Sequence, residues 1–369
     1  MRLFRGCFKM MELHFIGTGS CYPSLHRGAS CTVLRHQNSC WMFDCGEGTQ
    51  TKLMKSSIKP GRISKIFITH LHGDHVFGLP GFLCTTGQNC PENKAPIEVY
   101  GPIGLRKFIR TSLEISQSRL GYKYLVHELQ LSESLKGEFG GELPKNVHHA
   151  DNCLHPDELP GETILEGKNK MWEVCREGNL SIQAAPLKHR TVCFGYVIKE
   201  DKIPGRLDPV LLRKKGIPPG PLYAKIKQGE SIMAPNGTLV TPDEVIGQSR
   251  PGRKIVILGD TSDSMKIASA AMNCDCLVHE ATQEDELEEK AIEFGHSTPR
   301  MAGQFAKNIQ ANKLILTHFS QRYKNPSDED ENSDSPTLIK LLDQGKIAFQ
   351  SDNVIAAEDF NVVNIPLRN

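Results

Sequence analysis

The sequence lacks the features that define several large classes of protein. In 369 residues there is no apolar run near the roughly 20 residues that a membrane-spanning helix needs. The 12 cysteines are scattered without a C-x-x-C pair or a secretory signal, which is typical of buried, reduced thiols. We therefore expect no membrane and a cytoplasmic or nuclear location. The first ten residues carry three cations and no acid, so the sequence does not exclude targeting to an organelle.

The chain also has little net charge, +1 at pH 7, so its overall charge does not draw it toward nucleic acid. The charge is instead uneven along the chain. Residues 130–180 hold ten acids against five Lys/Arg, whereas residues 199–250 hold nine Lys/Arg against six acids and many Gly and Pro. We expect an acidic, loop-rich insertion in the first segment. Residues 199–250 are expected to be a basic, Gly/Pro-rich projecting arm. The alternative interpretation is a flap that covers the site.

The remaining residues are expected to form one large globular domain over 12–369, after an N-terminal extension at 1–11. Hydrophobic residues make up 38% of the chain and charged residues 24%, which is typical of a globular protein. Residues 327–335 carry five acids and predict a disordered surface loop.

The most informative stretch is T-H-L-H-G-D-H, which follows an apolar run that predicts a buried strand. It places His70, His72, Asp74 and His75 within six positions. Buried imidazoles and carboxylates need partners, and four of them together need a cation. The spacing divides them into two pairs, each suited to a different metal. We therefore expect a two-metal hydrolytic site whose nitrogen and oxygen ligands suit zinc.

Predicted strands and helices alternate along the chain, which is typical of a layered α/β fold. His189, Asp260 and His318 each follow a predicted strand, at the edge where sites form in such folds. Two similar halves would make a four-layer αββα sandwich with the site between the sheets. We expect one metal to be held by His70, His72 and His189, a second by Asp74, His75 and His318, and both to be bridged by Asp260.

Several motifs make the chain resemble a known family, tRNase Z (ribonuclease Z) in its short form, within the metallo-β-lactamase superfamily. Together they span residues 12 to about 323. Besides residues 69–75, the motifs are Phe15-Ile16-Gly17-Thr18-Gly19, the run from Phe43 to Gln50, Gly216–Pro221, His279-Glu280-Ala281-Thr282 and Gly295-His296-Ser297-Thr298. The resemblance implies an αββα metallo-β-lactamase sandwich with a projecting flexible arm, two zinc ions per subunit and a homodimer. One subunit's arm would hold precursor tRNA while the other subunit's site cuts.

The resemblance also implies a reaction, hydrolysis after the discriminator nucleotide that leaves a tRNA 3′-OH and a trailer 5′-phosphate. Two cations would activate the attacking water, and Asp74 could accept its proton. His296 is the candidate proton donor to the leaving oxygen, with Glu280 holding its ring. The segment around His296 could instead be only a helix start. Other readings are a zinc phosphodiesterase acting on cyclic phosphate RNA ends or small esters, and a non-catalytic RNA-binding scaffold.

Overall fold

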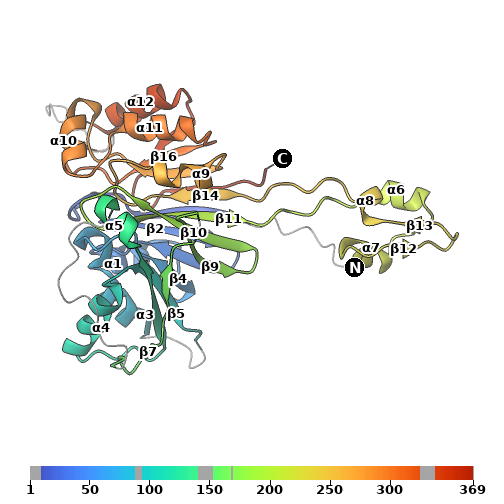
Figure 1. Cartoon of the computed structure of the whole chain (residues 1–369), viewed down its shortest axis with the longest axis horizontal. Helices are drawn as coiled ribbons and strands as arrows, with labels where there is room; N and C mark the ends of the chain where they lie inside the picture. Colours follow the sequence, from blue (N-terminus) through green and yellow to red (C-terminus); the bar gives the residue numbers. More distant parts are fainter. Residues whose placement is uncertain (1–9, 88–93, 140–152, 168, 325–336, 369) are drawn as a thin grey trace. The chain divides into compact units, whose positions relative to one another are not determined.

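The computed structural model describes residues 10–87, 94–139, 153–167, 169–324 and 337–368, and these form two compact units (Figure 1). The larger unit holds the described residues up to Glu177, Ser181–Ile198 and those from Lys254 to Pro366. The smaller one, called the arm unit below, comprises Gly178–Leu180, Lys199–Arg253 and residues 367–368. Among the described residues, no helix is both long enough and apolar enough to cross a membrane.

The first sheet of the larger unit has nine strands in the order β18-β1-β2-β3-β4-β5-β6-β7, with β8 beside β6. Strands β3 to β6 run parallel, so their carboxyl ends meet at one edge. The strands are β1 (Met11–Gly17), β2 (Cys31–His36), β3 (Ser39–Phe43), β4 (Ile63–Phe67), β5 (Ile97–Pro102), β6 (Tyr124–Gln130), β7 (Glu158–Leu159), β8 (Thr163–Leu165) and β18 (Val362–Asn364).

The second sheet has seven strands in the order β17-β16-β15-β14-β11-β10-β9. Its strands β14 to β17 are also parallel, which creates a second edge of carboxyl ends. The strands are β9 (Trp172–Glu177), β10 (Leu180–Leu187), β11 (Cys193–Glu200), β14 (Lys254–Ile257), β15 (Cys276–Glu280), β16 (Leu314–Thr317) and β17 (Val354–Ala356).

Helices cover the outer face of each sheet, and the two sheets face each other (Figure 1). On the first sheet these are α1 (Thr49–Lys55), α3 (Leu79–Gly87) and α4 (Leu105–Ile115). On the second they are α9 (Ala268–Ala271), α11 (Pro299–Asn308) and α12 (Leu338–Phe349), whereas α10 (Glu288–Glu293) contributes residues to the cleft described below. The four-layer αββα architecture expected from the sequence is therefore confirmed.

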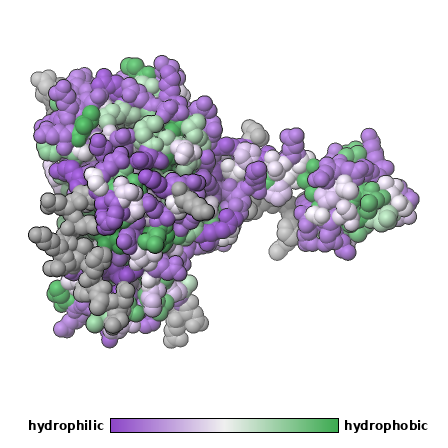
Figure 2. All heavy atoms as spheres, in the orientation of Figure 1, coloured by the Kyte–Doolittle hydropathy of each residue, from purple (hydrophilic) through white to green (hydrophobic). Residues whose placement is uncertain are grey.

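Aromatic rings fill the space between the two sheets. Phe67 of β4 stacks between Phe43 and Tyr100, at centroid distances of 5.0 and 5.1 Å. Tyr196 of the second sheet packs against Phe67 at 5.5 Å, and its hydroxyl donates a 2.7 Å hydrogen bond to the Ile68 carbonyl. Such pairs contribute about 0.5–1.5 kcal/mol each beyond their buried area. The face in Figure 2 is mostly hydrophilic, and the buried hydrophobic residues form the cores of the two sheets and their helices.

The segment 130–180 differs from the expected loop-rich insertion. Its described part contains helix α5 (Glu133–Phe139) and adds strands to both sheets. In β9, Trp172 and Val174 are buried on one face, and the Trp172 ring meets Phe194 edge-on at 5.2 Å. This period of two is the strand signal that the surrounding acidic residues concealed. Residues 140–152 and the expected loop at 327–335 lie outside the described residues, and β1 already begins at Met11.

The arm unit has a small apolar core of its own, so it is folded and not a plain Gly/Pro segment. Asp208 caps α6 by accepting hydrogen bonds from two backbone N–H groups at 2.9 Å, and Thr241 caps α8 through a capping box with Glu244. Its elements are α6 (Pro209–Lys214), α7 (Leu222–Lys227), α8 (Pro242–Val245), β12 (Ile232–Met233) and β13 (Leu239–Val240). Its buried residues are Leu212, Ile217, Ile226, Ile232, Ala234, Val240 and Val245.

Candidate metal centre

The histidine loop leaves the carboxyl end of β4 and turns at once into α2 (Gly73–Val76). A second loop, from the predicted F-D-C-G-E-G motif, packs directly against it. A Cβ at Gly46 would lie 2.1 Å from the carbonyl oxygen of Asp74, so only glycine fits this approach. This close packing fixes the turn that brings the loop's imidazoles and carboxylate together.

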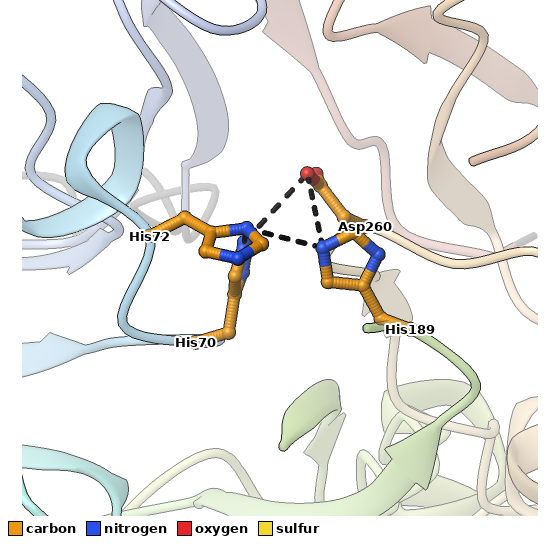
Figure 3. A group of neighbouring side chains, drawn as sticks. All are labelled: His70, His72, His189 and Asp260. Carbon is orange, nitrogen blue, oxygen red and sulfur yellow. Dashed lines mark hydrogen bonds and ion pairs between the residues drawn. The ribbon is translucent and has the colours of Figure 1, made fainter. Parts of the chain in front are cut away.

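One group of four side chains converges at this edge from both sheets (Figure 3). His72 Nδ1 lies 3.1 Å from His70 Nε2 and 3.2 Å from His189 Nε2. The Oδ2 atom of Asp260 lies 3.6 Å from His70 Nε2 and 3.9 Å from His189 Nε2. All four ligand atoms lie within 4.8 Å of one another.

A second group lies beside the first. His75 Nε2 and His318 Nε2 are 3.2 Å apart, and Asp74 Oδ2 lies 3.7 and 3.3 Å from them. The other carboxylate oxygen of Asp260, Oδ1, is 3.4 Å from both of these nitrogens. Asp260 thus presents one oxygen to each group, which is the placement of a bridging ligand.

The spacing within each group fits a bound zinc ion. Zinc–nitrogen bonds of about 2.0–2.1 Å in a tetrahedron put neighbouring ligand atoms roughly 3.3 Å apart. Most of the contacts given above fall close to that value. The structure therefore brings together all seven predicted ligand residues at this edge, arranged as expected from the sequence, and their spacing fits bound metal. His296 forms a third set with Asp260 and His318.

The electrostatics of the two groups also suit cations. Burial lowers the pKa of His70 well below its usual value and that of His72 to about 4, so these rings are neutral with lone pairs to offer. At His75 burial opposes the charged ring, but Asp260 and Asp44 outweigh it and hold its pKa well above the ordinary value. The carboxylates thus stabilise positive charge at this position, whether a proton or a metal ion carries it.

An outer layer of hydrogen bonds orients the ligands, and the sequence predicted none of these bonds. His75 Nδ1 donates to Asp44 Oδ2 at 2.8 Å, and His189 Nδ1 donates to the Gly295 carbonyl at 2.7 Å. His318 Nδ1 donates at 2.9 Å to Thr282 Oγ1, which itself donates to a carboxylate. Such bonds select the ring tautomer and raise ligand basicity. Of these partners, only Asp44 carries a sequence feature that could have identified it, because it is a carboxylate at the end of a buried strand.

His296 and Glu280, the predicted catalytic pair, lie beside these groups. His296 Nδ1 is 3.2 Å from Glu280 Oε1 and 3.7 Å from Asp260 Oδ2. Burial lowers the pKa of His296, but the charges of Glu280 and Asp260 outweigh it and raise the value to about 9. The helix-start reading also holds, because Thr298 accepts a hydrogen bond from the Met301 N–H as the N-cap of α11. The neighbouring His279 instead contacts Ser264 Oγ at 3.0 Å.

A cleft of about 760 Å³ opens over the metal groups. Arg190, Lys290 and Arg322 line it, and within the described ranges none of the three forms an ion pair with a carboxylate. Cations without such partners, set around a metal centre, suit a substrate with several negative charges. Arg27 is instead 2% exposed and donates to Thr18 Oγ1 at 2.7 Å, which is a structural role.

Fold and site together define a metal-dependent hydrolase of the metallo-β-lactamase fold. The family model described as Anti-Pycsar protein Apyc1 matches residues 11–115. The crystal structure of the metallo-β-lactamase fold protein YhfI from Bacillus subtilis matches with a TM-score of 0.56 at 14% identity, over 96% of this chain and 99% of that one. This match establishes the fold alone.

Two closer matches identify the family. The chain is 44% identical over 364 residues to zinc phosphodiesterase ELAC protein 1 of Bos taurus, covering 97% of this chain and 99% of the relative. It matches the crystal structure of human tRNase Z, short form, at 37% identity and a TM-score of 0.65, covering 96% of this chain and all of the other. The chain belongs to the short-form tRNase Z family.

Proposed function

We propose that the protein is a zinc-dependent endoribonuclease that removes the 3′ trailer from precursor tRNA by hydrolysis after the discriminator nucleotide. The observation that carries the proposal is the pair of ligand groups that share Asp260 in a cleft lined by cations. Within the described part of the chain these cations have no carboxylate partner. Two-metal sites of this kind serve in-line displacement at phosphorus. The name of the human relative, tRNase Z, supports precursor tRNA as the substrate.

In this proposal the seven residues of the two groups hold two zinc ions per subunit. Bound zinc would activate water as a nucleophile and stabilise the negative charge that develops on the phosphoryl oxygens. The Asp74 carboxylate accepts the proton of the attacking water. Its Oδ2 atom is held by the Cys21 N–H at 2.6 Å, which fixes the carboxylate at the floor of the cleft.

His296 donates a proton to the ribose 3′-oxygen as it leaves, which produces a tRNA 3′-OH and a trailer 5′-phosphate. Burial lowers the pKa of the ring, but the charge of Glu280 beside it raises the pKa, which favours the protonated form that a general acid needs. Glu280 orients the ring through their 3.2 Å contact, and the Thr261 N–H holds Glu280 Oε1 at 2.7 Å. This chain of hydrogen bonds keeps the donor in place.

The proposal also includes a role for the arm unit and a homodimer. Nine Lys/Arg against six acids in residues 199–250 favour phosphate contacts, and the apolar core of the unit gives them a defined surface. In the dimer, one subunit's arm unit holds the tRNA while the other subunit's site cuts it. The proposed location is the cytoplasm, the nucleus or both.

The test compares three substrates with zinc-loaded protein: a precursor tRNA with a 3′ trailer, an RNA with a terminal cyclic phosphate, and bis(p-nitrophenyl) phosphate. We expect kcat/KM to be highest for precursor tRNA by several orders of magnitude, because only this substrate reaches both the arm unit and the cleft. A higher kcat/KM for the cyclic phosphate, or turnover of the small ester without any cleavage of precursor tRNA, would overturn the proposal.

A further inference from the structure

Two aromatic rings stand half exposed in the otherwise polar cleft above the metal groups. Phe294 is 42% exposed and Tyr22 is 59% exposed, and both line the cleft. Single exposed apolar side chains are common on protein surfaces, so these two rings are informative only because they line the cleft. The proposed mechanism gives neither ring a role.

The backbone at Phe294 is anchored beside the candidate ligand His189. It follows the last residue of α10, and its N–H donates to the Lys290 carbonyl at 3.1 Å. The next residue, Gly295, has φ 75° and its carbonyl accepts the 2.7 Å hydrogen bond from His189 Nδ1. The Phe294 backbone therefore lies next to the residue whose carbonyl holds His189.

The exposed guanidinium of Arg190 lies over the Phe294 ring, 5.7 Å from its centroid. Arg190 has no carboxylate partner among the described residues, so its charge stays available to a phosphate. An aromatic face beside a guanidinium is the arrangement that binds single-stranded nucleotides, with the base on the ring and the cation near the backbone.

We propose that Phe294 and Arg190 form a platform for the base of the nucleotide on the 5′ side of the cut. This inference rests on the proposed function, and it adds the residues that select a polynucleotide over a small ester. The side of the cut follows from His296, which is two residues from Phe294 and would protonate the 3′-oxygen of that nucleotide. Phe294, Arg190 and His296 all line the same cleft, which places the platform and the proton donor on one substrate.

Tyr22 is linked to the group that acts on the attacking water, and not to the proton donor of the leaving oxygen. It follows Cys21, whose N–H holds Asp74, the residue proposed to accept the proton of the attacking water. Gln321 supports the Tyr22 backbone by donating to its carbonyl at 2.7 Å. The Phe294 platform is therefore assigned to the nucleotide that keeps the 3′-OH, and Tyr22 is not part of it.

The test is a double-mutant cycle between protein and substrate. Wild type and Phe294→Ala are each assayed on a precursor tRNA and on the same RNA with an abasic residue immediately 5′ of the cut. Base–aromatic stacking is worth about 1–3 kcal/mol, so the abasic residue should lower wild-type kcat/KM roughly 5- to 150-fold. In Phe294→Ala the abasic substrate residue should lower kcat/KM less than about threefold, because its stacking partner in the protein is already missing.

Phe294→Leu separates stacking from packing, since it keeps apolar bulk without a π face and should also lose the abasic penalty. Phe360→Ala is the matched control: Phe360 is 43% exposed and carries Lys52 Nζ at 5.4 Å from its ring centroid, outside the residues lining the cleft. It should keep the full abasic penalty. An equal abasic penalty in wild type, Phe294→Ala and Phe294→Leu would overturn the platform, as would coupling only to an abasic residue on the 3′ side. Absence of precursor cleavage by wild type would instead overturn the proposed function.

Discussion

The replacement Asp260→Asn should weaken metal binding at both groups at once. The side chain keeps its shape, but the 2% exposed residue loses the charge that faces imidazole nitrogens at 3.4 to 3.9 Å. Zinc held by four ligands gains about 10–16 kcal/mol, so one ligand accounts for roughly 2.5–4 kcal/mol if they share equally. We therefore expect each metal to bind about 10²- to 10³-fold more weakly, and precursor tRNA cleavage to be abolished at limiting zinc.

The assay is a competition titration against a zinc chelator of known affinity, together with a count of zinc per chain. Asp263→Asn is the matched control, because this exposed carboxylate is on the same loop and accepts only the Met265 N–H in the described contacts, at 2.8 Å. It should bind zinc like wild type. If Asp260→Asn held two zinc ions with wild-type affinity, the bridging role of this residue would be wrong.

Three further predictions test other parts of the structure. Thr282→Val should weaken zinc binding at the His318 group about 10- to 100-fold, while Thr282→Ser should restore it; equal affinities would show that the hydroxyl does not orient the ring. Removing residues 203–247 should lower kcat/KM for precursor tRNA far more than for bis(p-nitrophenyl) phosphate, and equal losses would favour a structural lid. Gly17→Ala should destabilise the fold by roughly 2 kcal/mol or more in denaturant titration, since its Cβ would lie 1.8 Å from a carbonyl oxygen, whereas Gly61→Ala, with open space, should not.

The convergence of the candidate ligands could be predicted from the sequence because parallel strands gather their carboxyl ends at one edge. His189, Asp260 and His318 each end an apolar run, and these runs became β10, β14 and β16 of one sheet. The loop after β4 of the other sheet meets them there. A local pattern therefore located residues nearly 250 positions apart, since His75 Nε2 and His318 Nε2 are 3.2 Å apart at a sequence separation of 243.

The outer layer could not be predicted in this way because it depends on tertiary contacts without sequence spacing. Asp44 reaches His75 from another loop, and Thr282 reaches His318 from another strand end. Within the motif at residues 279–282, the resemblance to the family pointed to Glu280. Glu280 faces His296, whereas His279 contacts Ser264 on the other face of β15. The hydrophobic residues of the arm unit are likewise separated by Gly and Pro and lie in very short elements. They show no helix or strand period that would indicate a core.

The central claim is metal-dependent cleavage of precursor tRNA at one defined bond. The most direct measurement is incubation of the purified protein with an end-labelled precursor, with chelator and again after zinc is restored, followed by mapping of both new ends. The account predicts one cut after the discriminator nucleotide, lost with chelator and recovered with zinc, leaving a 3′-OH and a 5′-phosphate. Cleavage that persists in chelator, or ends carrying a 3′-phosphate, would contradict it.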